Sequence, residues 1–113
     1  MEFKEVVSAL SALAQETRLR VFRLLVEAGP EGLPATEIAD RLGVRHNLMS
    51  THLTILANAG LTTARREGRR VFHSIEFENT RSLLSFLVED CCNGCPEKCA
   101  SLLDEILPAS ACA

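Results

Sequence analysis

Residues 35–60 read ATEIADRLGVRHNLMSTHLTILANAG, and this stretch decides the fold. Residues 35–42 carry apolar side chains at helical spacing, and Gly43 suits the end of such a helix. A second helix is predicted from His46 to Ala59, with Gly60 ending it and Leu61 supplying an apolar contact just beyond. Two short helices joined by a tight turn are the outline of a helix-turn-helix over residues 35–60.

The second of these helices has two unlike sides. Its apolar residues are expected to face the core, and they are Leu48, Met49, Leu53, Ile55 and Leu56. The opposite side carries short hydrogen-bonding groups, namely His46, Asn47, Ser50, Thr51, Thr54 and Asn58. It has no Glu or Lys, which a merely solvated helix face would normally carry. We therefore predict that this face, with Arg45 before it, meets double-stranded DNA.

A hairpin is predicted after the helix-turn-helix, over residues 61–77. Residues 61–66 and 70–77 alternate well enough to be two strands, and Glu67-Gly68-Arg69 forms the turn between them. Four arginines surround that turn: Arg65, Arg66, Arg69 and Arg70. Two would indicate an ordinary solvated tip, but four beside a helix-turn-helix favour a wing that binds phosphates or the minor groove.

The charge of the chain is unevenly distributed. The net charge is −3, but residues 41–77 hold six basic and two acidic side chains, and every basic one is an arginine. Residues 1–40 hold four basic and seven acidic side chains, and residues 78–113 hold two and six. A basic island between acidic ends suits a surface that faces phosphates.

Helices are also predicted on both sides of this region. Residues 1–14 form an amphipathic helix, and a central apolar helix begins at Thr17 as its N-cap and ends before Gly29-Pro30. Residues 29–34 read as a loop. Residues 79–90 form another strongly apolar helix, and together with residues 1–14 it exposes more apolar surface than so small a domain can cover. We predict a single, mainly α domain over residues 1–113, a winged helix-turn-helix with a small β-hairpin that forms a two-fold homodimer.

The segment 91–113 is rich in cysteine. Four of the five cysteines, Cys91, Cys92, Cys95 and Cys99, lie within nine residues interrupted by Gly94 and Pro96. A segment so rich in turns makes a poor core. The cluster therefore indicates a thiolate site for a soft ion or a redox signal. Cys112, in a Pro/Ala/Ser tail, is expected to be a free thiol.

Length and composition limit the function classes. A chain of 113 residues makes one domain without room for a large enzyme cleft, and no apolar run is long enough to cross a membrane. The acidic start lacks the order of a secretory signal, so we expect a cytoplasmic protein whose thiols stay reduced. The βαβ pattern of a thiol oxidoreductase is missing, as are paired catalytic carboxylates and a Ser/His/Asp set, so no enzyme is predicted.

Several motifs together resemble those of the ArsR/SmtB family of winged-helix repressors, in particular its arsenic-responsive branch. They are the run at residues 16–25 (ETRLRVFRLL), residues 47–53 (NLMSTHL) leading to Ala59-Gly60-Leu61, residues 66–69 (REGR) and residues 89–92 (EDCC). The resemblance covers about residues 10 to 99. It implies that the helix from His46 reads operator DNA without a cofactor, and that an inducer releases it.

Two departures from the family pattern bear on the inducer. The cysteine pair that many arsenic repressors carry in the first helix of the motif is absent from residues 33–39, and residues 80–89 lack the histidine of zinc-responsive relatives. Sensing would therefore lie in the C-terminal cysteines. Trivalent arsenic (arsenite) binds three thiolates in a pyramid, which Cys91, Cys92 and Cys99 could supply, with Cys95 as the competitor. Zinc, an iron–sulfur cluster and an oxidant-sensing disulfide stay open as alternatives.

Overall fold

The computed structural model describes residues 1–88 of the chain. The chain divides into two units, Met1–Leu83 and Leu84–Ala113. The helix-turn-helix and the wing both belong to the first unit. Among the described residues, no helix has the length and apolar character needed to cross a membrane.

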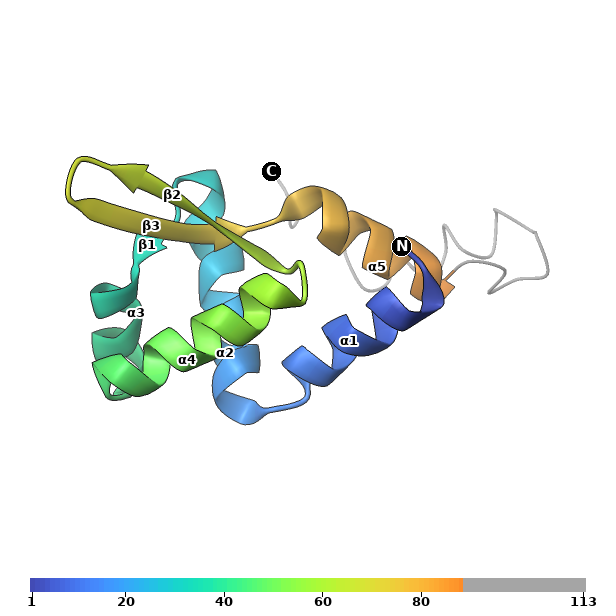
Figure 1. The fold of residues 1–113 in the computed structure, drawn as a ribbon, viewed down its shortest axis with the longest axis horizontal. Coiled ribbons are helices and arrows are strands. Elements are labelled where there is room, and N and C mark those ends of the chain that lie inside the picture. Colours follow the sequence, from blue (N-terminus) through green and yellow to red (C-terminus); the bar gives the residue numbers. More distant parts are fainter. Residues whose placement is uncertain (89–113) are drawn as a thin grey trace, which may run out of the picture. The chain divides into compact units, whose positions relative to one another are not determined.

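The described elements are mainly helical (Figure 1). In chain order they are α1 (Phe3–Leu13), α2 (Glu16–Ala28), the 3-10 turn η1 (Gly29–Glu31), β1 (Leu33–Pro34), α3 (Ala35–Leu42), α4 (His46–Asn58), β2 (Thr62–Glu67), β3 (Arg70–Ile75) and α5 (Phe77–Val88). The predicted winged helix-turn-helix is confirmed, with α3 and α4 as the helix-turn-helix and β2 and β3 as the wing.

The core of the first unit forms where α2, α3 and α4 meet. Val21 and Leu25 of α2, Ile38 of α3, and Met49 and Leu56 of α4 are all fully buried. Burying a side chain of this size contributes about 1.5–3 kcal/mol relative to leaving it exposed. The core therefore fixes α4 through one side only, and the opposite side stays on the surface.

The sheet has three antiparallel strands in the order β1-β3-β2. Leu33 of β1 pairs with His73 of β3, and Glu67 of β2 pairs with Arg70 at the tip of the hairpin. Gly68 in the turn has φ +63°, as predicted for this glycine. Residues 29–34 are not simply a loop, because they contain η1 and β1. A strand of two residues is too short to show any alternation in the sequence.

Helix starts differ from the prediction at two positions. Thr17 does not cap α2; Gln15 does, because its side chain accepts a hydrogen bond from the Arg18 backbone N–H at 2.8 Å. β3 ends at Ile75, so Phe77 belongs to α5 and not to the strand. The Glu76 carbonyl accepts bonds from the Thr80 N–H at 3.0 Å and the Thr80 hydroxyl at 2.9 Å, which starts the helix earlier than residue 79.

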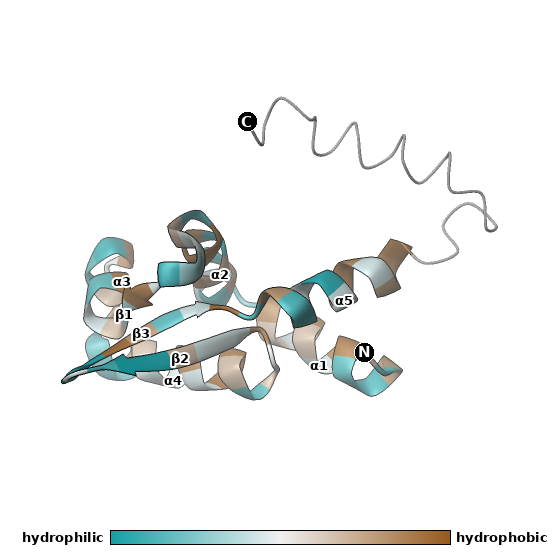
Figure 2. Cartoon of the chain, turned by 90° about the horizontal axis from the view of Figure 1, so that it is seen from above, coloured by the Kyte–Doolittle hydropathy of each residue, from teal (hydrophilic) through white to brown (hydrophobic). Residues whose placement is uncertain are grey.

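The end of α4 connects the helix directly to the wing. The last helical residue is Asn58, one before the predicted Ala59. Beyond it, the Gly60 N–H donates to the Ala57 carbonyl and the Leu61 N–H to the Leu56 carbonyl, both at 3.0 Å, which is the bonding pattern of a Schellman cap. Leu61 is fully buried, as expected of the apolar residue after such a cap. Strand β2 begins at the next residue and is strongly hydrophilic towards its end (Figure 2).

Candidate nucleic-acid interface

The polar face predicted for α4 lies on the surface. Met49, His52, Leu53 and Leu56 are buried, whereas the predicted site residues His46, Asn47, Ser50, Thr51 and Thr54 are exposed. Leu48 departs from the prediction, because 49% of its surface is exposed instead of facing the core. It lies in the first turn of α4, beside the buried stripe, where the core residues do not cover it.

The hydroxyl groups of this face are bonded to their own helix. The Thr54 hydroxyl donates to the Ser50 carbonyl at 2.9 Å, the Ser50 hydroxyl to the His46 carbonyl at 3.2 Å, and the Thr51 hydroxyl to the Asn47 carbonyl at 3.4 Å. Each oxygen therefore presents its lone pairs outwards and can accept a bond from a base amino group. Donation to a phosphate requires the hydroxyl to rotate away from the carbonyl.

An acidic partner at the start of α4 was not anticipated from the sequence. His46 Nε2 lies 2.9 Å from the Asp40 carboxylate of α3, and both side chains are exposed. This contact ties the imidazole to α3, so His46 is less free to turn towards a ligand than Asn47 beside it. A spacing of six residues across a turn gives no helical signal that would reveal such a pair.

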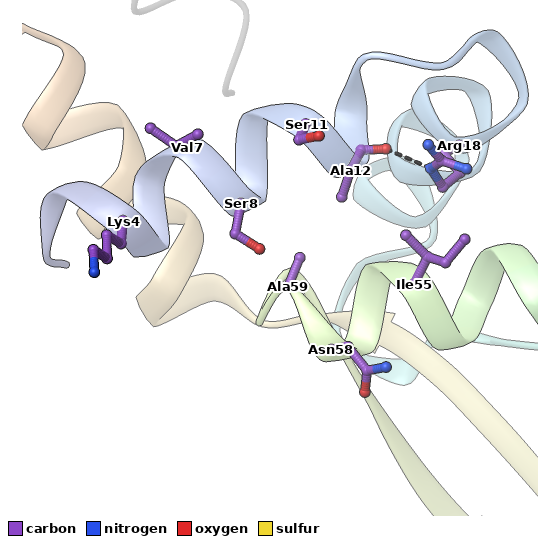
Figure 3. Close-up of a pocket in the computed structure, with 9 residues that line it drawn as sticks. All are labelled: Lys4, Val7, Ser8, Ser11, Ala12, Arg18, Ile55, Asn58 and Ala59. Carbon is purple, nitrogen blue, oxygen red and sulfur yellow. Dashed lines mark hydrogen bonds between the residues drawn. The ribbon is translucent and has the colours of Figure 1, made fainter.

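His52 is packed inside, as expected of a histidine at the boundary of the buried side. Its Nδ1 lies 3.5 Å from Nη1 of Arg18, whose Nε donates to the Ala12 carbonyl at 2.7 Å (Figure 3). Burial, and then the charge of Arg18, lower the pKa of His52, which favours the neutral imidazole. Arg18 thus joins the end of α1 to the middle of α4. It also lines the hollow between α1 and α4 that Figure 3 shows.

The four wing arginines divide into two pairs. Arg65 donates from Nε to Glu67 at 3.1 Å and from Nη2 to the Glu31 carbonyl at 3.2 Å, and its guanidinium stacks over Phe72. Arg70 lies over the same ring, 5.4 Å from its centre. By contrast, Arg66 and Arg69 are exposed and make no ion pair with any of residues 1–88, and the same holds for Arg45 before α4.

Comparisons with known proteins match this architecture. A family model described as a helix-turn-helix domain matches residues 13–65. The regulator NmtR of Mycobacterium tuberculosis is 35% identical over 80 residues, which span 71% of this chain and 64% of NmtR. A putative arsenical resistance operon repressor ArsR of Halobacterium salinarum is 43% identical over 63 residues, 56% of this chain and 48% of that protein. The chain thus spans less than two thirds of the length of these two relatives.

Two further matches extend over most of the chain that is compared. The HTH-type transcriptional regulator YbzH of Bacillus subtilis is 30% identical over 95% of its length and 74% of this chain. The homodimeric winged helix-turn-helix DNA-binding domain Mb0332 of Mycobacterium bovis, described as a possible ArsR-family regulator, has a TM-score of 0.63. It is 28% identical, with 77% of this chain and 81% of that chain covered. The chain belongs to the ArsR/SmtB family of winged-helix transcriptional regulators. This membership confirms the prediction of a regulator and not an enzyme.

The cysteines of this ArsR/SmtB regulator all follow the described region. Cys91, Cys92, Cys95, Cys99 and Cys112 lie outside the described residues, as do the end of the helix predicted to residue 90 and the segment 91–113. Within residues 1–88, no three His, Cys, Asp or Glu side chains come together as a group that could hold a metal ion.

Proposed function

We propose that this ArsR/SmtB regulator is a cytoplasmic homodimeric repressor that binds a palindromic operator and releases it when trivalent arsenic binds its C-terminal cysteines. The observation that carries the DNA-binding part is the exposed face of α4. This face presents Asn47, Ser50, Thr51 and Thr54 without a carboxylate among them, and it lies on the same unit as the arginine-bearing wing.

Asn47 is the best-placed base reader of this face. It is exposed in the first turn of α4, its amide both donates and accepts, and no side-chain hydrogen bond engages it within residues 1–88. Asparagine amides pair with adenine in the major groove through two hydrogen bonds. The free arginines Arg45, Arg66 and Arg69 would supply phosphate or minor-groove contacts that position the helix.

Dimer formation is supported by the apolar surface of α1 and by the homodimeric M. bovis domain. Val7 and Leu10 of α1 are 54% and 40% exposed, while the small residues Ala9 and Ala12 face the core. We propose that residues 1–14 and 79–90 form the dimer contact. A two-fold dimer would present two copies of α4 to two half-sites about one helical turn apart.

The proposal that arsenic is the inducer rests on thiolate chemistry and on the putative arsenical resistance repressor among the relatives. Cys91, Cys92 and Cys99 would bind As(III), with Cys95 as the alternative third ligand. Binding would change the relation between the two subunits, so that the two copies of α4 no longer match both half-sites. A coupling free energy of about 1–3 kcal/mol would lower operator affinity roughly 5- to 150-fold.

The test is fluorescence anisotropy of the reduced protein on a labelled operator, titrated with arsenite and separately with zinc. We expect arsenite alone to release the DNA. Cys91→Ser/Cys92→Ser should bind DNA but no longer respond, while Cys112→Ser, the matched control, should respond like the wild type. Release by zinc alone, or release that survives in the double variant, would overturn the assignment of inducer or site.

A further inference from the structure

A hollow of about 210 Å³ lies between α4 and the wing. Ser50 and Thr54 of α4 form one wall, and Thr63 and His73 of the two wing strands form the other. The remaining lining residues are apolar, and none of those that line it carries a carboxylate. The walls therefore offer two kinds of hydrogen-bond donor, hydroxyl and imidazole, with no negative side chain among them.

His73 is the unusual member of this wall. It pairs with Leu33 and Ala64 in the neighbouring strands and is half-buried, and its ring has no hydrogen-bond partner within residues 1–88. It also lines an adjacent hollow whose rim carries Arg69 and Arg70. The N–H of such a half-buried imidazole, which has no partner within residues 1–88, is available to donate a hydrogen bond to a ligand.

The geometry of DNA indicates which ligand fits this place. If α4 enters the major groove and the wing reaches the neighbouring minor groove, the sugar-phosphate backbone that separates the two grooves must cross between them. Hydroxyl groups are common donors to phosphate oxygens, and the N–H of an imidazole ring can donate in the same way. Because this argument needs α4 and the wing in adjacent grooves, it rests on the proposed function.

We propose that His73, with Ser50 and Thr54, holds one phosphodiester group of the operator in the hollow between α4 and the wing. The hydroxyl donors differ in how easily they are freed. The Ser50 bond to its helix carbonyl is long at 3.2 Å, whereas that of Thr54 is 2.9 Å, so Ser50 rotates at the lower cost. His73 has no bond to break and is the principal donor.

The phosphate should change the protonation of His73. Burial lowers its pKa in the free protein, which keeps the ring neutral near neutral pH. The charged groups that border His73 are Arg69 and Arg70. The other neighbours carry no charge; they are Ser50, Thr54, Thr63, Leu33, Ala35 and Thr36. A phosphate against the ring favours the charged form and raises its pKa, so DNA binding takes up a proton and strengthens as the pH falls.

The first experiment follows the imidazole signals of the free and operator-bound protein by NMR across neutral and mildly acidic pH. We expect the pKa of His73 to rise on the operator, while that of buried His52 stays in place as the internal control. An unchanged His73 pKa on bound DNA would overturn the proposal. Failure to bind any DNA would instead overturn the proposed function itself.

The second experiment replaces operator phosphates one at a time with neutral methylphosphonate. At one position in each half-site, the substitution should lower the affinity of the wild type about tenfold or more. The same substitution should hardly lower the affinity of His73→Leu, which lacks the donor. Thr54→Val, a change at an exposed position, keeps the test informative if His73→Leu folds poorly. His46→Gln, at the far end of the face, is the matched control and should show no coupling there. Equal losses in wild type and both variants at every position would overturn the proposal.

Discussion

At the scale of single residues, Gly32 is the described glycine that leaves the least room for a side chain. Its φ is +72°, and a Cβ built there would overlap the His73 carbonyl oxygen and lie 2.8 Å from the carbonyl carbon. Because both atoms belong to the backbone of β3, the collision cannot be relieved by turning a side chain. The residue sets how closely β1 approaches β3.

We expect Gly32→Ala to lower the free energy of unfolding by about 2–4 kcal/mol, since it adds the collision to the backbone strain. Gly29→Ala is the control, because Gly29 has φ +75° but nothing within 4 Å of its Cβ position. That variant carries the backbone strain without the collision, so it should lose about 1–3 kcal/mol and less than Gly32→Ala. Urea unfolding followed by circular dichroism measures both, and equal losses would contradict the proposed close approach.

Buried histidines should make stability depend on pH. The pKa of His52 is lowered in the fold by burial and by Arg18, so the unfolded chain binds a proton near pH 6.5 that the folded chain does not. Stability is therefore retained above that pH and declines as the pH falls below it. We expect the urea midpoint to drop on mild acidification, and to drop less in His52→Gln. An equal drop in both proteins would show that His52 does not titrate differently on unfolding.

At the scale of elements, one arginine attaches the wing to the rest of the domain, and other arginines of the wing stay available to bind DNA. Arg65 bonds to Glu67 and to the carbonyls of Pro30 and Glu31, so it attaches β2 to η1. Its stacking over Phe72, its cross-strand neighbour, adds a contact on the same face. If the Arg65 guanidinium moved to a phosphate, these contacts would break. If Arg69 moved to a phosphate, it would break no ion pair within residues 1–88.

We expect Arg65→Ala and Arg69→Ala to separate these two roles. Arg69→Ala should leave stability within about 0.5 kcal/mol and reduce the slope of log affinity against log salt concentration by about one. Arg65→Ala should cost about 1 kcal/mol of stability and leave that slope unchanged. Anisotropy titrations at several salt concentrations, with urea unfolding of each variant, measure both quantities. A lower slope in Arg65→Ala would assign it to phosphate binding.

Elements with strong local signals could be predicted from the sequence, and contacts between elements could not. The helix-turn-helix and the hairpin turn follow from apolar spacing and from Gly43, Gly60 and Gly68. The strand β1, the Asp40–His46 contact and the place of His73 depend on chain segments that meet only after folding. Helical spacing predicts Leu48 in the core, but it cannot show where neighbouring elements stop covering a helix, and Leu48 is exposed.

At the scale of the whole molecule, the charge distribution agrees with the proposed interface. A net charge of −3 would disfavour DNA if it were spread evenly, but six arginines lie within residues 41–77. Arg45, Arg66 and Arg69, the exposed arginines of this stretch that make neither an ion pair nor a ring contact in the described residues, flank α4 or form the wing tip. The acidic surface elsewhere would oppose binding in other orientations, so electrostatics favours one face.

Homodimeric binding makes a final prediction about operator spacing. Two copies of α4 related by a two-fold axis can enter two half-sites together only if both half-sites lie on one side of the DNA. Inserting about five base pairs between them, half a helical turn, should reduce affinity to that of a single half-site. Changing the inserted sequence without its length should have little effect. Fluorescence anisotropy measures the affinity for three fragments: the original operator, the operator with the insertion, and the operator with an insertion of the same length but another sequence. Full affinity after the half-turn insertion would contradict a rigid two-fold dimer.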